Sequence, residues 1–250
     1  MADDTRVAAV DVLGPPGQTA PAPLIAPVLG PPTADQPAQA EPTPLEKRRA
    51  IPSSGRGLVG HTALTVPAGS VEISMRSVVP YAGLATISAG IGSTTELSAE
   101  LGGVREGEDP VALFGAGVKQ VLVRGDRVQV SVGGTIRRVR DPDAESITIG
   151  QFGGTVSACA DRQCSLLFSA GLSAMYATEA DSMRPVISLA ISAGSRNTRF
   201  LGEVFVIERA AAVFGGVRFG NAKFTGDVGL MTMVLDEFGV LPFAGFSTRM

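Results

Sequence analysis

The stretch Ile187-Ser188-Leu189-Ala190-Ile191-Ser192-Ala193-Gly194 decides the fold, because large apolar side chains alternate with small or polar ones. A β-strand points successive side chains to opposite faces, so this stretch predicts a strand with one apolar face. The same alternation recurs along the chain, at Val71–Arg76, Glu96–Leu101 and Arg127–Val132.

The pattern extends to 12 expected strands and begins near residue 70. Many of them approach the roughly 9–11 residues that a tilted strand needs to cross a bilayer. No run of about 18 apolar residues offers a membrane helix. The expected strands span residues 70–78, 83–92, 95–103, 111–124, 127–139, 145–159, 164–178, 183–195, 198–208, 210–220, 224–236 and 241–250.

The links between these strands differ in length at the two ends of the sheet. Short turns are expected at 92–94, 125–126, 160–163, 196–197 and 221–223, and longer or more charged links at 104–110, 140–144 and 179–182. Short turns on one rim and longer loops on the other are typical of outer-membrane barrels. Because lipid offers the backbone no hydrogen bonds, such a sheet must close on itself. We therefore expect an all-β, antiparallel up-and-down barrel.

One hairpin carries a family resemblance. Leu84 to Gly92, a short turn, and then Glu96-Leu97-Ser98-Ala99-Glu100-Leu101-Gly102-Gly103 resemble the hairpins of uncharacterised outer-membrane β-barrel proteins of Gram-negative bacteria. The resemblance covers about residues 70–250. The chain departs from such barrels in ending at Met250 and in having only two tyrosines, Tyr81 and Tyr176.

The aromatic residues form two expected bands, as interfacial anchoring requires. In a soluble sheet they would be ordinary strand-end residues. Near the long-loop rim we place Tyr81, Phe114, Tyr176, Phe238 and Phe243, and near the short-turn rim Phe168, Phe200, Phe219 and Phe224.

Charged residues within the strands share the face opposite the apolar one. In a barrel that face is the lumen, where opposite charges can pair and largely fill a narrow interior. A plugged or slender pore is therefore favoured over an open channel. The lumen-facing set is Glu72, Arg76, Glu96, Glu100, Arg127, Arg137 and Arg218, and Lys119, Glu203 and Asp227 are expected to join it.

Residues 1–55 are expected to form a disordered Pro/Ala-rich tail before a barrel domain at 56–250. The tail holds 11 of the 17 prolines and repeats Val12-Leu13-Gly14-Pro15-Pro16 at 28–32. Proline lacks the N–H that helices and ladders need, so the tail should be extended and mobile. It is either a spacer or a tether with a possible periplasmic partner. The cluster Lys47-Arg48-Arg49 is expected to be a solvated linker rather than a contact for lipid headgroups.

The two cysteines, Cys159 and Cys164, suit a disulfide across the mouth of a hairpin. A zinc site is not indicated, because only two thiol ligands are present and the lone histidine, His61, is distant. A disulfide implies an oxidising compartment.

The sequence predicts a non-enzymatic outer-membrane barrel with a structural or narrow-pore role and an unknown substrate. A single histidine leaves little material for a catalytic triad, and no cofactor or metal site is expected. The net charge of −3 gives no reason to expect nucleic acid, so the expected partner is outer-membrane lipid. Ala2-Asp3-Asp4 reads as a mature start, from which we expect a removed signal peptide or a misassigned start codon. The alternative is a secreted or cytosolic β-sandwich that acts as a binding module.

Overall fold

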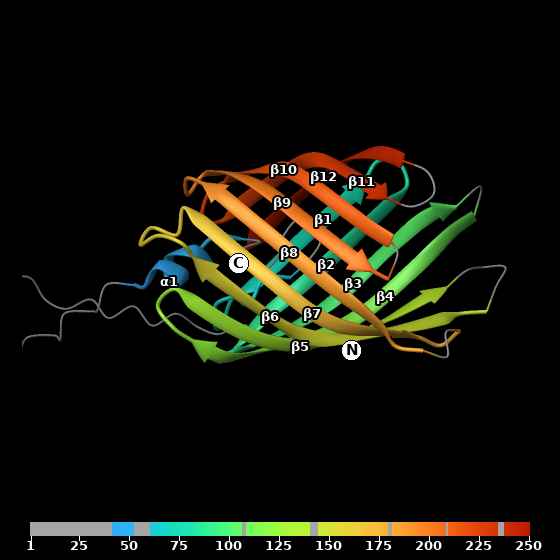
Figure 1. The fold of residues 1–250 in the computed structure, drawn as a ribbon, viewed down its shortest axis with the longest axis horizontal. Helices are drawn as coiled ribbons and strands as arrows, with labels where there is room; N and C mark the ends of the chain where they lie inside the picture. The colour runs from blue at the N-terminus through green and yellow to red at the C-terminus, as the bar shows by residue number, and fades with distance from the viewer. Residues whose placement is uncertain are drawn as a thin grey trace, which may run out of the picture. The chain divides into compact units, whose positions relative to one another are not determined.

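The computed structural model describes residues 42–52, 61–106, 109–140, 145–179, 182–208, 210–234 and 238–250. Its strands form one closed barrel (Figure 1). The strands are β1 (Val71–Val78), β2 (Ala82–Ile91), β3 (Thr95–Glu106), β4 (Asp109–Arg124), β5 (Val128–Arg140), β6 (Ile147–Cys159), β7 (Leu166–Ala177), β8 (Arg184–Gly194), β9 (Thr198–Ile207), β10 (Ala210–Gly220), β11 (Phe224–Val234) and β12 (Phe238–Arg249).

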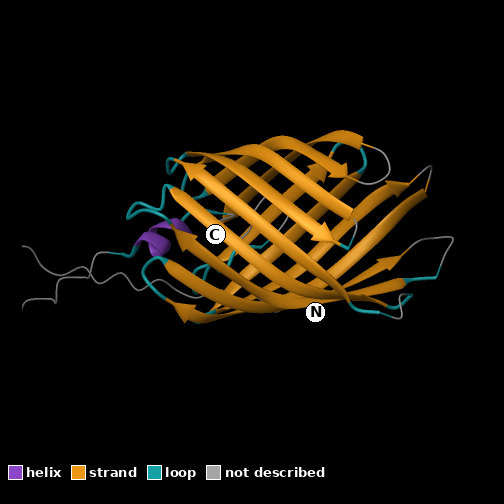
Figure 2. Ribbon diagram, viewed as in Figure 1, coloured by secondary structure: helices purple, strands orange, loops and turns teal. Residues whose placement is uncertain are grey.

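Every strand pairs antiparallel with its neighbours in sequence, and β1 pairs with β12 to close the ring. At this seam Glu72 lies opposite Arg249, and Val78 lies opposite Phe243. The strands cross the barrel obliquely (Figure 2). The predicted antiparallel up-and-down barrel of 12 strands is confirmed.

The barrel is apolar outside and polar inside. On β8 the outward Leu189 is 54% exposed, whereas the inward Ser192 is buried. On β5 the inward Gln129 is fully buried, although the neighbouring Val128 is exposed. A soluble sandwich would bury its apolar residues between two sheets, so this single closed sheet excludes the sandwich alternative.

The two rims differ from the expected pattern in one respect. The expected link at 104–110 is mostly strand, because β3 continues to Glu106 and β4 begins at Asp109. Paired backbone groups satisfy each other, so the hairpin extends rather than ending in a long loop. The links at 141–146 and 178–183 remain the longer ones on that rim.

The aromatic bands appear on the outer face with one exception. Tyr81, Phe114 and Tyr176 are exposed near one rim, and Phe168, Phe200, Phe219 and Phe224 near the other. Phe243 is an error of the prediction, because its side chain is buried in the lumen against Phe214. The side chain of Phe238 lies outside the described residues.

The segment before the barrel also differs from the expectation. Residues 42–52, which we expected in an extended tail, contain the helix α1 (Pro44–Arg49). The rest of the expected tail, at 1–41 and 53–55, lies outside the described residues. None of the described helices has the length and apolar character needed to cross a membrane.

Candidate functional site

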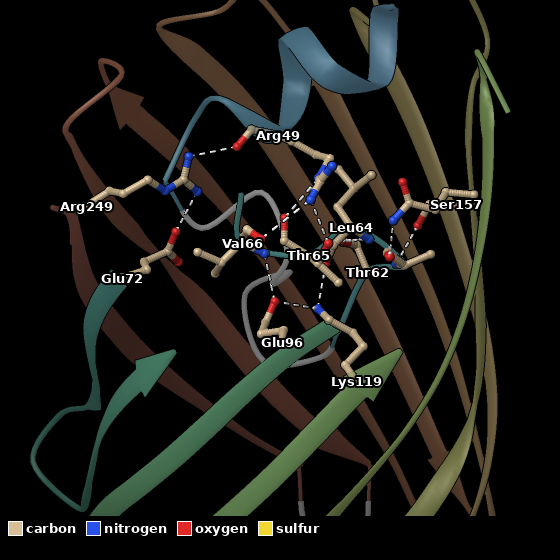
Figure 3. A network of polar contacts seen from close by, with 12 residues as sticks. Arg49, Thr62, Leu64, Thr65, Val66, Glu72, Glu96, Lys119, Ser157 and Arg249 are labelled. Atoms are coloured by element: carbon tan, nitrogen blue, oxygen red, sulfur yellow. Dashed lines mark hydrogen bonds and ion pairs between the residues drawn. The ribbon is translucent and has the colours of Figure 1, made fainter. Parts of the chain in front are cut away.

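Two short pieces of chain occupy the lumen at the short-turn rim, and we call them together the lumenal plug: residues 42–52 and 61–68. Figure 3 shows wall side chains pointing at the plug from several strands. All five residues at 62–66 are buried, although this piece contains no helix or strand. The plug is the candidate functional site, because it lies across one mouth of the barrel.

Local sequence explains why the first piece of the plug is helical. The Thr43 hydroxyl accepts a hydrogen bond from the Glu46 backbone N–H at 3.3 Å, and the Glu46 carboxylate accepts one from the Thr43 N–H at 2.9 Å. This reciprocal pair is a capping box, and Pro44 at the first helical position suits its fixed φ. The cap therefore stabilises a helix of only six residues.

Leucines anchor both pieces of the plug to the wall. Leu45 of α1 and Leu64 of the second piece are almost completely buried. They cluster with Leu167 of β7 and with the cysteine pair, Cys159 and Cys164. Burying a leucine side chain stabilises by about 1.5–3 kcal/mol, so these two contribute much of the apolar attachment.

The irregular backbone at 63–66 is satisfied by side chains of the wall. Peptide groups inside a membrane-spanning barrel need such partners, because an unpaired buried group is costly. The contacts are Ala63 N–H to Ser157 Oγ at 2.9 Å, Gln129 Nε2 to the Ala63 carbonyl at 2.7 Å, Lys119 Nζ to the Leu64 carbonyl at 2.5 Å, and Val66 N–H to Glu96 Oε2 at 2.9 Å.

Arginines join the two pieces to each other and to the barrel seam. Arg49 Nε donates to the Thr65 carbonyl at 3.1 Å, and its Nη2 donates to the Thr65 hydroxyl at 2.9 Å. Arg249 of β12 donates to the carbonyl oxygens of Arg49 and Ile51 and also to Glu72 of β1. The plug is thus tied to the strands that close the barrel.

Arg48 attaches the plug to the barrel wall at β8. Its Nη2 donates to the Ser192 hydroxyl of β8 at 3.0 Å. Burial, and secondarily the nearby guanidinium groups of Arg199 and Arg218, lower the pKa of Arg48. The solvated linker that we expected at 47–49 is therefore wrong for Arg48 and Arg49, which are both buried; Lys47 is exposed.

A wall glycine makes room for the plug. The Gly90 N–H donates to the Ser70 carbonyl oxygen, and the Gly90 carbonyl accepts from Gly69 N–H. A Cβ added at Gly90 would clash with the backbone carbonyl groups of Val66 and Pro67. The plug backbone therefore lies directly on the backbone of β2, where no side chain fits.

The structure brings most of the predicted lumen-facing residues into ion pairs with one another or with their neighbours. Glu72, Glu96, Glu100 and Arg218 are buried, and Arg76 and Arg137 are half-buried. Arg127 does not join them, because the chain turns there before β5 begins, which leaves its side chain exposed at the rim. The pairs are Glu72–Arg249, Glu96–Lys119, Glu100–Arg137 and Arg218–Asp227.

The half of the lumen away from the plug has two unlike sides. On one side Arg137 Nε donates to Glu100 Oε2 at 2.7 Å. On the other, Phe214 and Phe243 form an apolar cluster that extends to Leu201 beside the plug, and Phe205 and Met231 pack against it. A Cβ at Gly229 would meet the Phe243 ring at 2.6 Å, so glycine lets this ring lie against the wall.

The cysteines are joined in the structure. Cys159 and Cys164 form a disulfide across the turn between β6 and β7, with 4.8 Å between their Cα atoms. Within the same turn Asp161 accepts hydrogen bonds from the side chain and backbone of Ser165 and from the backbones of Gln163 and Leu166. These bonds lower the pKa of Asp161 to about 2, so the carboxylate holds the turn at any pH above that value.

We expect no free thiol in the folded protein. Purified protein, denatured without reductant and treated with a maleimide, should take up no label at Cys159 or Cys164, and two labels after reduction. A Cys164→Ser variant, which leaves Cys159 unpaired, is the positive control and should take up one label. Complete labelling of the unreduced parent would contradict the disulfide.

The plug was missed because its contacts are not local, but two signals for it were present. The first is the capping box formed by Thr43 and Glu46, with Pro44 between them. The second is the row of hydrogen-bonding side chains on inward positions next to the short turns, at Glu96, Lys119, Gln129 and Ser157. Among the described residues, no group of His, Cys, Asp or Glu side chains is placed to hold a metal ion.

Comparison with known proteins gives the fold. No protein-family model matches the chain, and no curated protein is similar to it in sequence. Among solved structures, the KdgM porin in complex with disordered oligogalacturonate is similar with a TM-score of 0.59 and 8% identity, over 72% of this chain and 98% of that one. The NanC porin is similar with a TM-score of 0.51 and 12% identity, over 72% and 99%.

The class of protein that the closed barrel and its apolar outer face define is the outer-membrane β-barrel. The family resemblance and the outer-membrane location predicted from the sequence agree with this fold. Both similar structures are porins by name.

Proposed function

We propose that this chain is a non-enzymatic outer-membrane protein with a narrow pore whose short-turn mouth is closed by the lumenal plug. Support comes from the plug backbone at 63–66, which is bound by wall side chains rather than lying loosely in the lumen. Short turns face the periplasm in such barrels, so the closed mouth is the periplasmic one.

The charge pattern of the wall bears on what the pore would admit. The named ion pairs neutralise most of the inward charges, as in Glu96–Lys119 at 3.3 Å and Glu100–Arg137 at 2.7 Å. The oligogalacturonate in the name of one similar porin belongs to that protein. Here the paired charges favour small polar solutes without a strong preference for charge.

Loosening the plug should open the pore. Leu45→Ser with Leu64→Ser removes both apolar anchors and leaves the wall unchanged; each large-to-small change at a buried leucine costs about 2–5 kcal/mol. Reconstituted in planar bilayers, the double variant should show conductance steps well above those of the parent.

A matched control separates plug release from damage to the barrel. Ala50→Ser with Ala68→Ser changes one exposed residue in each piece of the plug and should conduct like the parent. If parent, control and double variant all conduct alike while inserted, the plug does not close the pore and the proposal is wrong.

A further inference from the structure

Within the part of the chain that the structure describes, charged side chains on the outer wall are found at one place. Outward positions of the described strands hold apolar, small or uncharged side chains, with the exception of three arginines near the long-loop rim. They are Arg105 on β3 and Arg138 and Arg140 on β5, and all three are exposed. The other charged side chains that the structure describes on the strands occupy inward positions.

The register places these arginines side by side around β4. Arg138 lies opposite Phe114, and Arg140 lies opposite Ala112. On the other edge of β4, Gly103 lies opposite Ala112, and Arg105 is two residues further toward the rim. Strands lie about 4.8 Å apart, so side chains on β3 and β5 span roughly 10 Å across the small residues of β4.

The three arginines lie at the level along the barrel where lipid headgroups are expected. On β5 the outward series Val128, Val132 and Ile136 is exposed and apolar, and Arg138 and Arg140 continue it toward the rim. Arg138 is level with Phe114, one of the aromatic residues of the interfacial band. A lipid-facing arginine is costly at the bilayer midplane and much less costly at the interface, so these arginines lie where charge is tolerated.

The described residues supply no counter-charge for two of them. Neither Arg138 nor Arg140 forms an ion pair or side-chain hydrogen bond within the part of the chain that the structure describes. By contrast, Arg184 at the same rim points inward and pairs with Glu208 at 3.5 Å. Guanidinium groups bind phosphate in a bidentate manner, which makes a phosphorylated headgroup a suitable partner.

We infer that Arg138 and Arg140, with Arg105 beside them, form a binding surface for the phosphate groups of the glycolipid in the outer leaflet. The inference rests on the proposed membrane location, because the long-loop rim then faces the outside. It is independent of whether the plug closes the pore. Phosphate-bearing lipid would fix one side of the barrel, over β3–β5, to the surrounding leaflet.

Binding of purified lipid A to the full chain in detergent micelles, measured by native mass spectrometry, tests the inference. Arg138→Gln with Arg140→Gln should weaken binding by about 5-fold for each arginine, or about 25-fold for both. Arg138→Lys with Arg140→Lys keeps the charge and should lose less. Dephosphorylated lipid A should bind the parent as weakly as phosphorylated lipid A binds the Gln variant.

The matched control removes the same charge from the opposite rim, by Arg124→Gln with Arg127→Gln. It should bind lipid A like the parent. All variants are first checked for the heat-dependent gel mobility of a folded barrel. Equal affinity of the folded Gln variant and the parent, an equal loss in the control, or indifference to the phosphate groups would each overturn the inference.

Discussion

Asp227→Ala should destabilise the barrel more than any other single change in its wall, by about 3–5 kcal/mol. Arg218 Nε and Nη2 donate to the two oxygens of Asp227 at 2.7 and 2.8 Å, and both side chains are buried. Removing the carboxylate leaves a buried guanidinium without its main partner, and breaking such a pair costs far more than the pair itself contributes.

Equilibrium unfolding in urea, with the protein in micelles, measures this loss. The chain has no tryptophan, so circular dichroism or gel mobility must report the folded fraction. Arg184→Ala is the control, because its pair with Glu208 is nearly half exposed and such pairs contribute under about 1 kcal/mol. Replacing both partners, as Arg218→Met with Asp227→Leu, should cost less than Asp227→Ala alone. A loss for Asp227→Ala no larger than that of the control would refute the role given to the pair.

Leu189→Arg should have the second largest effect, because it puts a charge against lipid halfway along β8. Leu189 is outward and 54% exposed, and an arginine at the bilayer midplane costs about 2–4 kcal/mol. The same unfolding measurement applies, with Leu189→Ala as the control for loss of the leucine side chain. A cost for arginine that matches the cost for alanine would mean that position 189 does not face lipid.

Contact with lipid can be measured directly. Single cysteines at 130, 189 and 217, in a background without Cys159 and Cys164, should carry fluorophores that lipid-borne quenchers reach in bilayers. Probes at 100 and 218 should not be quenched, because Glu100 and Arg218 are buried on the lumen side. Equal quenching of both sets would contradict the inside-out arrangement.

The strands could be predicted from the sequence because their signal is local. The alternation at Ile187–Gly194 needs no knowledge of any other segment, and the structure has β8 over Arg184–Gly194. Turn positions could also be predicted from the local sequence. At Asn221–Lys223 the Asn221 Oδ1 accepts hydrogen bonds from two backbone N–H groups. The alternation also predicted which side chains point into the lumen. Arg127 marks the limit of that prediction, because it precedes β5 and its side chain is exposed.

The plug could not be predicted in this way, because its order depends on partners far away in sequence. Residues 62–66 have no regular structure of their own, and the groups that hold them lie on strands up to 94 residues further along the chain. Only the closed ring brings those groups together. Proline content predicted an extended tail, but at 42–52 the burial of Leu45, Arg48 and Arg49 outweighs this local tendency.

The seam between β1 and β12 has a consequence for how the protein is assembled. The plug immediately precedes β1, and Arg249, near the end of β12, binds both Glu72 of β1 and the plug carbonyls of Arg49 and Ile51. The twelfth strand of the barrel therefore joins the first strand and also contributes one side chain to the attachment of the plug. Without β12 the sheet has two unpaired edges, on β1 and β11, and the plug lacks its contacts with Arg249, so closure of the ring and this part of the plug's attachment depend on the same strand.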